Sequence, residues 1–196
     1  MAQEGFIEIP NDCGVLAATL AAGAYSDEAD PDAGRRHRRW TAVGALLNAA
    51  KYHPGSLTAD DALAELSRRM INIAQSHVAC ARVTTVVAAP GSDPTGPSFS
   101  ERLAEDVALG LGLPVIGVRS RLGRRRSAKE RPAKRAGDYD IDDDLRGQRV
   151  LVVDDVFATG TTLSAVAQAA LEAGAERCVG LVAAWRLPHS RSGSLS

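Results

Sequence analysis

RVLVVDDVFATGTTL occupies residues 149–163 and joins the clearest strand of the chain to its clearest ligand loop. The unbroken apolar run Val150 to Val153 predicts a strand that is buried on both faces of a sheet. We expect this strand to end at the adjacent carboxylates Asp154 and Asp155. A short loop of small and hydroxyl residues follows, and the amphipathic run LSAVAQAALEAGA then predicts a helix.

The loop between this strand and this helix has the composition of a phosphate site. A helix N-terminus leaves backbone N–H groups without partners and carries the positive end of the helix dipole. Gly160 lets the backbone approach an anion closely, and the hydroxyls of Thr159, Thr161 and Thr162 add donors. Because a phosphate offers only acceptor oxygens, such a loop can bind it without a lysine or an arginine.

The acidic pair points to the rest of the ligand. Two carboxylates would repel a phosphate placed on them, so we expect them to accept hydrogen bonds from sugar hydroxyls or to face a hydrated cation. The predicted ligand is therefore a phosphorylated sugar. A P-loop is excluded because no lysine follows Gly160, and a dinucleotide fingerprint is excluded because this loop has one glycine.

Length and composition favour one α/β domain. A chain of 196 residues is most often a single domain, and 45% hydrophobic content with only 4% aromatic residues suits helices on a parallel sheet. The net charge of −1 argues against a protein that binds polyanions over its whole surface.

The cysteines and the apolar runs bear on location. Cys13, Cys80 and Cys178 are odd in number and widely spaced, which excludes a zinc ribbon and a disulfide framework and fits a reducing compartment. We see neither a signal peptide nor an apolar run long enough to span a membrane. We therefore expect a cytoplasmic protein with no membrane partner.

Helical and strand patterns alternate along most of the chain. Residues 1–26 predict an edge strand or hairpin, although the Ala-rich part also fits a helix. Thr58 opens a capping-box-like sequence, and either Ser98 or Ser100 caps a later helix. The expected helices are 34–52, 58–75 and 100–112, and the other expected strands are 82–89, 113–118 and 178–185.

This order predicts an α/β fold, with a mostly parallel twisted sheet and helices on both faces. We expect residues 1–187 to form one domain and residues 188–196 to be a frayed tail. Ligands of such sheets bind beyond the carboxyl ends of the strands. The loop PGSDPTGPS at 90–98 and the loop after Asp155 should therefore face one pocket.

Residues 119–144 predict a flexible loop, because arginines and lysines and then aspartates follow one another without apolar periodicity. Three interpretations of its basic half, which includes Arg124 and Arg125, stay open. It is a hood that closes over the ligand, a nucleic-acid patch with strong salt dependence, or a solvated loop.

DDVFATGTT after four apolar residues resembles the phosphoribosyl pyrophosphate (PRPP) motif of type I phosphoribosyltransferases. The resemblance covers the chain from about residue 40 onward and is greatest to ComF-like proteins. NAAKYHPG at 48–55, SFSERLAEDVALGLGLPV and LRGQRVLVVDDVFATGTTLSAVAQAALEAGA carry it. It implies the Rossmann-like fold of that superfamily with a flexible hood. It also implies Mg²⁺ as cofactor, PRPP as donor, pyrophosphate as product and a nucleobase-like acceptor.

The resemblance also implies roles for single residues. Asp154 and Asp155 would be catalytic and contact the ribose hydroxyls of PRPP, directly or through Mg²⁺, while Arg124 and Arg125 lie where the family has its hood. The residues expected at the 5-phosphate are Ala158, Thr159, Gly160, Thr161 and Thr162, and those expected at pyrophosphate are Pro90, Gly91 and Ser92.

Two further residues have open roles. Lys51 either reaches a phosphate or, as a lysine at a helix end, complements the helix dipole. Trp185 either stacks on the acceptor base or packs at the rim of the core.

The sequence departs from the family pattern in two places. It has no paired cysteines of an N-terminal zinc ribbon, and residues 96–100 keep only Phe99 of the family's basic stretch after the pyrophosphate loop. Two functions therefore stay open. One is a Mg²⁺-dependent phosphoribosyltransferase with an unidentified acceptor. The other is a non-catalytic PRPP or nucleotide-binding regulator, or a ComF-like protein linked to DNA uptake or processing. A homodimer also stays open.

Overall fold

A computed structural model describes residues 5–10, 14–26, 40–53, 57–91, 96–121 and 137–187. Its main sheet has six strands in the order β1-β2-β8-β7-β3-β4, and every neighbouring pair except β1 and β2 is parallel. The strands are β1 Ile7–Glu8, β2 Thr19–Ala21, β3 Thr85–Ala88, β4 Val115–Ile116, β7 Arg149–Phe157 and β8 Arg177–Trp185. The mostly parallel sheet predicted from the sequence is confirmed.

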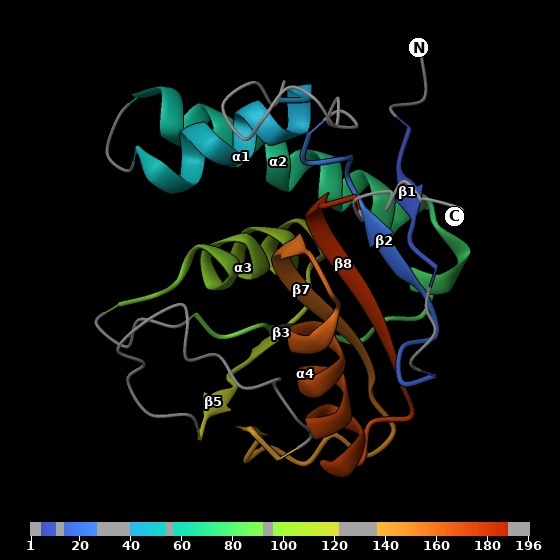
Figure 1. The fold of residues 1–196 in the computed structure, drawn as a ribbon. Helices are drawn as coiled ribbons and strands as arrows, with labels where there is room; N and C mark the ends of the chain where they lie inside the picture. Colours follow the sequence, from blue (N-terminus) through green and yellow to red (C-terminus); the bar gives the residue numbers. More distant parts are fainter. Residues whose placement is uncertain are drawn as a thin grey trace, which may run out of the picture.

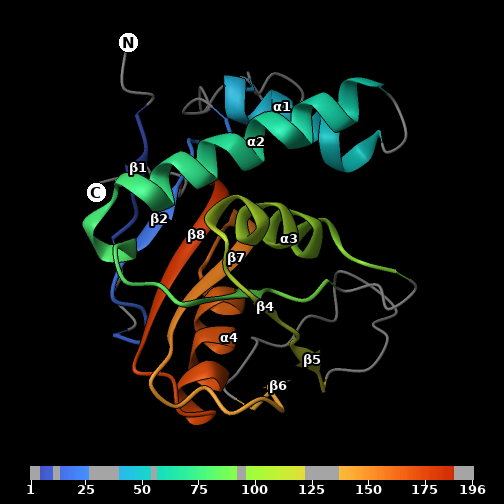
Figure 2. The same ribbon diagram turned by 180° about the vertical axis from the view of Figure 1, so that it is seen from behind.

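Helices cover both faces of this sheet, as expected (Figures 1 and 2). The helices are α1 Ala42–Tyr52, α2 Leu57–Ser76, α3 Phe99–Leu111 and α4 Thr161–Glu172, with a short 3₁₀ helix at Val78–Cys80. α1, α2 and α3 pack on one face, and α4 packs on the other.

The core consists of two apolar layers that share the central strands. Leu151 and Val153 of β7 belong to the layer under α1, α2 and α3, whereas Val150 and Val152 belong to the layer under α4. All four side chains are fully buried. The alternation follows from the period of two residues in a strand, and it explains why β7 is apolar on both faces.

The N-terminal segment is a pair of strands, as the hairpin alternative predicted. β1 and β2 are antiparallel, and β2 lies parallel to β8 with Leu20 opposite Leu181. The alternative of a helix over the Ala-rich run is wrong, because Thr19–Ala21 completes the hydrogen bonding of the edge of β8.

Several predicted element ends are wrong. β7 continues through the two carboxylates to Phe157, because β8 pairs with it along its whole length. α1 begins at Ala42 because Thr41 is its N-cap and accepts the N–H of Gly44 at 2.9 Å, so Trp40 lies outside the helix. α2 begins at Leu57, which places Thr58 within the helix, and β3 and β4 are shorter than the predicted strands.

The ends of the stretch predicted as a loop at 119–144 form a two-stranded antiparallel ribbon, β5 Arg119–Ser120 with β6 Tyr139–Asp140. Just beyond it, Ile141 and Leu145 are buried in the α4 layer. The predicted residues Ser92, Arg124 and Arg125 and the tail 188–196 lie outside the described residues. In the described part of the chain, no helix is both long and apolar enough to cross a membrane.

Candidate functional site

The two loops expected to share a pocket leave the same edge of the sheet. β3, β7 and β8 are parallel neighbours, so their carboxyl ends lie together. Pro90 and Gly91 follow β3, and residues 158–160 follow β7. α1 lies at the end of the sheet toward which the arrowheads of β7 and β8 point (Figure 1).

Asp154 is held by the first turn of α3. The buried hydroxyl of Ser100 donates to Asp154 Oδ1 at 3.0 Å, and the backbone N–H of Asp155 donates to the same oxygen at 2.8 Å. Two donors on one oxygen fix the orientation of the carboxylate. The sequence named Ser100 only as an alternative helix cap, so this contact with Asp154 was missed.

Asp155 is held by α1. Lys51, in the last turn of that helix, forms an ion pair with Asp155 Oδ2, and the side chain of Asp155 is only 14% exposed. Burial lowers the pKa of Lys51, but the charge and hydrogen bond of Asp155 outweigh it and raise this pKa above its usual value. Lys51 therefore stays charged beside the acidic pair at neutral pH.

The loop after β7 is shaped for an anion. Gly160 adopts a left-handed φ of 72°, which favours glycine, and a Cβ there would lie 2.7 Å from Cζ of Phe157, so another residue would also have to displace that ring. Thr159 Oγ1 and Thr161 Oγ1 are hydrogen-bonded at 2.7 Å. Gly160 is the N-cap of α4, no side chain caps this helix, and its first turn has no acidic residue. The N-terminus of α4 is thus open to a phosphate.

The two ends of the loop after β3, at Gly91 and Ser98, lie close together. A Cβ on Gly91 would lie 2.3 Å from Cβ of Ser98, so this glycine allows the two ends of the loop to approach. Ser98 is the N-cap of α3 and forms a capping box with Glu101. The same helix therefore positions one end of this loop and, through Ser100, the carboxylate of Asp154.

Two tyrosines lie near the Lys51–Asp155 pair, and the sequence patterns did not predict this place for Tyr25: Lys51 Nζ lies 5.9 Å from the centre of the Tyr52 ring, and the charges of Lys51 and Asp155 act on Tyr25. Tyr25 stacks edge to face on Trp40 with ring centroids 5.0 Å apart, and the guanidinium of Arg186 lies 5.6 Å from the Tyr25 ring. Burial, together with the neighbouring Tyr52, raises the pKa of Tyr25. No local signal could have placed Tyr25 here, because it arrives on the segment after β2 that pairs with the end of β8.

Trp185 is the last residue of β8 and lies opposite Phe157 in the sheet. Its half-buried side chain packs against the core layer under α4. This position agrees with the rim packing that the sequence left open beside stacking on a base.

Comparison with known families identifies the chain. Residues 96–194 match the family model described as "Phosphoribosyl transferase domain", which is about half of the chain and includes both α3 and the loop at 158–162. This chain belongs to the phosphoribosyltransferase family. Its mostly parallel sheet with helices on both faces is the fold that the sequence led us to expect of a member.

Solved phosphoribosyltransferase structures resemble the chain at low identity. A purine phosphoribosyltransferase from Pyrococcus horikoshii is 23% identical over 60% of this chain and 71% of its own, with a TM-score of 0.42. The adenine phosphoribosyltransferase of Saccharomyces cerevisiae is 18% identical over 67% and 70%, with a TM-score of 0.45. That of Rhodothermus marinus is 21% identical over 80% and 79%, with a TM-score of 0.41. No curated protein matches the sequence as a relative.

The acidic pair of this phosphoribosyltransferase fits a magnesium ion that arrives with a substrate. Mg²⁺ retains several waters and binds proteins through one or two carboxylates together with substrate phosphates. Asp154 and Asp155 supply those carboxylates. No group of three or more His, Cys, Asp or Glu side chains that could hold a metal occurs among the described residues. Two carboxylates would be enough to hold an ion that is shared with substrate phosphates.

Proposed function

We propose that this phosphoribosyltransferase-family protein binds PRPP and Mg²⁺ at the carboxyl ends of β3 and β7 and transfers phosphoribose to a nucleobase-like acceptor. One observation carries the proposal. The acidic pair on β7 is followed within a few residues by an uncapped helix N-terminus and a pair of hydrogen-bonded threonines. A ligand with a diol at one end and a phosphate at the other matches this order of groups.

In this proposal each part of the site contacts one part of PRPP. Asp154 and Asp155 accept hydrogen bonds from the ribose hydroxyls, and Gly91 belongs to the loop that binds pyrophosphate. The residues at the 5-phosphate are Ala158, Thr159, Gly160, Thr161 and Thr162, and Pro90 and Ser92 complete the pyrophosphate loop. Arg124 and Arg125 belong to the hood, Lys51 holds Asp155 beside the donor, and Trp185 lies at the acceptor end.

The reaction breaks the bond between the anomeric carbon and pyrophosphate and forms a bond from that carbon to a ring nitrogen of the acceptor, which loses its proton. Positive charge develops on the ribose in the transition state, and the carboxylates of Asp154 and Asp155 stabilise it. Bound Mg²⁺ would neutralise charge on the leaving phosphates. Ser100 and Lys51 keep both carboxylates oriented, so little reorganisation is needed.

A second function, binding PRPP or a nucleotide without turnover, is supported by a different observation. The described residues of the 90–98 loop bring no lysine or arginine to the leaving group, and the charge of Asp155 is already compensated by Lys51. A protein of this kind would sense PRPP, and a ComF-like link to DNA uptake or processing would be one use of such sensing.

Calorimetry with PRPP and Mg²⁺ tests the binding shared by both functions. We expect a saturable heat for the wild type and a loss of affinity of at least about tenfold for D154N/D155N, about 1.4 kcal/mol. Arg68→Gln, an exposed substitution on α2, is the matched control and should bind as the wild type does. No heat from the wild type, or unchanged binding by D154N/D155N, would contradict both functions.

Pyrophosphate release in the presence of a panel of nucleobases separates the two. Pyrophosphate release that requires one base and is lost in D154N/D155N supports the transferase. Saturable PRPP binding without pyrophosphate release in the presence of any base supports the sensor. A function in DNA uptake or processing predicts that the protein binds single-stranded DNA more weakly as the salt concentration rises. It also predicts that charge reversal of residues 124–126 abolishes this binding.

A further inference from the structure

A cavity opens at the opposite edge of the sheet from the PRPP site. It has a volume of about 360 Å³ and lies where β7 and β8 begin, under the turn that follows the 3₁₀ helix. β7 is nine residues long and runs from Arg149 at this edge to Phe157 at the other, a span of about 25 Å. A ligand here would not touch the acidic pair or the threonine loop.

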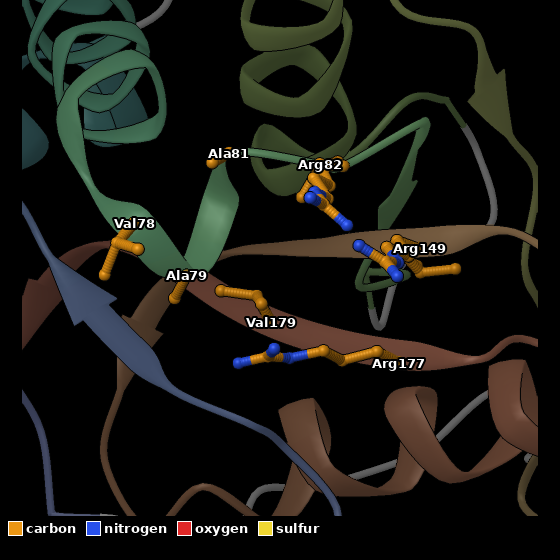
Figure 3. A pocket seen from close by; sticks show the side chains of 9 residues that line it. Val78, Ala79, Ala81, Arg82, Arg149, Arg177 and Val179 are labelled. Atoms are coloured by element: carbon orange, nitrogen blue, oxygen red, sulfur yellow. The ribbon is translucent and has the colours of Figure 1, made fainter.

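Three arginines from three segments line this cavity. Arg82 follows the 3₁₀ helix, Arg149 is the first residue of β7, and Arg177 is the first residue of β8. In Figure 3 the guanidinium groups of Arg82 and Arg149 point toward one another, and Arg177 extends past Val179 toward the segment of Val78.

The arginines are poorly compensated by the protein itself. Arg149 and Arg177 are direct partners in the parallel pairing of β7 and β8, and like charges placed opposite each other in a sheet are destabilising. Oε2 of Glu176 lies 3.3 Å from Nε of Arg149, and this ion pair is exposed to solvent. Within the described ranges no carboxylate comes within ion-pair distance of Arg82 or Arg177. The cavity therefore has an excess of positive charge.

The walls between the arginines are aliphatic. They are formed mainly by Val78, Ala79, Ala81, Val83 and Val179, while the side chain of Val150 is buried on the other face of the sheet, under α4. A cavity of this size, mainly apolar with a few charged groups, has the composition of a small-molecule site. Guanidinium groups bind phosphate oxygens in pairs of parallel hydrogen bonds, which suits them to phosphate more than to a single negative atom.

We propose that this cavity is a second anion site of the protein, which takes a phosphate group, free or as the head of a small phosphate ester. The phosphate contacts the guanidinium groups of Arg82 and Arg149, which point toward one another, and its negative charge relieves the repulsion between Arg149 and the neighbouring Arg177. In an ester, the organic part lies against the valines. The proposal is independent of the PRPP site, since the two share no residue.

Methyl NMR of the full chain labelled on valine tests this site locally, because the side chains of Val78, Val83 and Val179 lie at the cavity. Inorganic phosphate and adenosine 5′-monophosphate are titrated without Mg²⁺, with sodium chloride at equal ionic strength as reference. We expect saturable shifts at these three valines, and a loss of affinity of at least about tenfold in R82Q/R177Q. R68Q, which changes an exposed arginine on α2, should titrate as the wild type does.

The outcomes are separable. No shift at Val78, Val83 and Val179 with millimolar phosphate, equal shifts with chloride, or unchanged binding by R82Q/R177Q would each overturn the proposal. Binding of the nucleotide at least tenfold tighter than phosphate would mean that the site takes an ester, and equal affinities would mean that it takes the free ion. Binding at these valines that persists in D154N/D155N distinguishes this site from the PRPP site.

A stability measurement checks the electrostatic argument. Arg177 is exposed, so R177Q should fold, and relief of the repulsion from Arg149 should raise the melting temperature in phosphate-free buffer by about 1–3 °C. Phosphate should then stabilise the wild type more than R177Q. A lower melting temperature for R177Q in phosphate-free buffer would contradict the proposal.

Discussion

Gly160 gives the loop after β7, the proposed phosphate loop, its left-handed turn. Its φ of 72° is in the left-handed region, and Phe157 fills the space that a Cβ would need. Gly160→Ala should therefore displace the loop and weaken PRPP binding by at least about tenfold, besides lowering the free energy of unfolding by about 1–2 kcal/mol. Calorimetry and urea unfolding measure the two effects.

Gly147→Ala is the matched control for this change. Gly147 has a similar φ of 75°, but nothing lies within 4 Å of its added Cβ. The free energy of unfolding of the G147A protein should be about 1 kcal/mol lower than that of the wild type, and its affinity for PRPP should be unchanged. Equal PRPP affinities for G160A and the wild type would show that the loop does not hold the ligand.

Lys51 should give the protein a measurable alkaline transition. A residue whose pKa is raised by folding stabilises the fold below its unfolded pKa and loses that contribution as the pH rises through the folded value. The usual pKa is 10.5 and that of Lys51 lies above it. The stability difference between wild type and Lys51→Met, about 1–3 kcal/mol at pH 8, should therefore hold up to about pH 10 and shrink above it.

Thermal unfolding between pH 8 and 12 measures this difference. Arg69→Met is the control, because it removes a cation that also forms an ion pair, with Glu65, and because arginine side chains in general are not deprotonated in proteins. A difference for K51M that remains constant to pH 12 would mean that the ion pair with Asp155 does not form in solution.

At the scale of elements, α3 links the two loops of the site through two serines of one turn. Ser98 caps the helix, whereas Ser100 donates to Asp154. Ser98→Ala should cost about 1 kcal/mol of stability through the lost cap. Ser100→Ala should have the smaller effect on stability and the larger effect on PRPP affinity, because Asp154 loses one of its donors. Urea unfolding and calorimetry on both variants would contradict this assignment if the two effects were reversed.

Two buried threonines of the sheet should respond in opposite directions, in the free energy of unfolding, to replacement by valine. Thr19 on β2 is buried, and its Oγ1 is the buried side-chain oxygen that has no hydrogen-bond partner in the described part of the chain. Thr85 on β3 is also buried, but its hydroxyl donates to Pro114 O at 3.3 Å. Thr19→Val should raise the free energy of unfolding by about 1 kcal/mol, and Thr85→Val should lower it by about 0.5–1 kcal/mol. Urea unfolding that gave the same sign for both would contradict this.

Element prediction succeeded where the sequence pattern was long and local. The runs around Leu66 and Leu103 predicted α2 and α3, and the apolar run before Asp154 predicted β7. Element ends were less predictable, since β7 continues through charged residues only because β8 lies beside it. The ion pairs of Arg119 and Arg121 were also unpredictable from local sequence. Both arginines pair with Asp140, and Arg119 also pairs with Asp142. The two ends of the predicted loop therefore come together in the ribbon.

At the scale of the molecule, two cysteines report on the two layers of the core. Cys80 belongs to the layer under α1, α2 and α3, and Cys178 belongs to the layer under α4. Burial raises the pKa of Cys80 to about 11 and that of Cys178 to about 12, although Arg177 lowers the former slightly. Both should be unreactive thiols in the folded protein at pH 8.

If the layers unfold as one unit, labelling with an aromatic disulfide at pH 8 should modify Cys80 and Cys178 at the same slow rate. PRPP with Mg²⁺ should slow both by the same factor, since the ligand binds the native state only. Peptide mass spectrometry separates these sites from Cys13. A faster reaction at one of them would mean that its layer opens independently.

The sequence by itself determined the α/β class, the place of the acidic pair and the phosphate loop beside it, because a buried strand, a glycine turn and a helix start are properties of neighbouring residues. Only the tertiary structure decided what holds that pair. Ser100 and Lys51 come from two distant segments, and Arg149 and Arg177 at the opposite edge are neighbours because β7 and β8 are in register. Contacts of this kind depend on how strands and helices pack, and no local pattern encodes them.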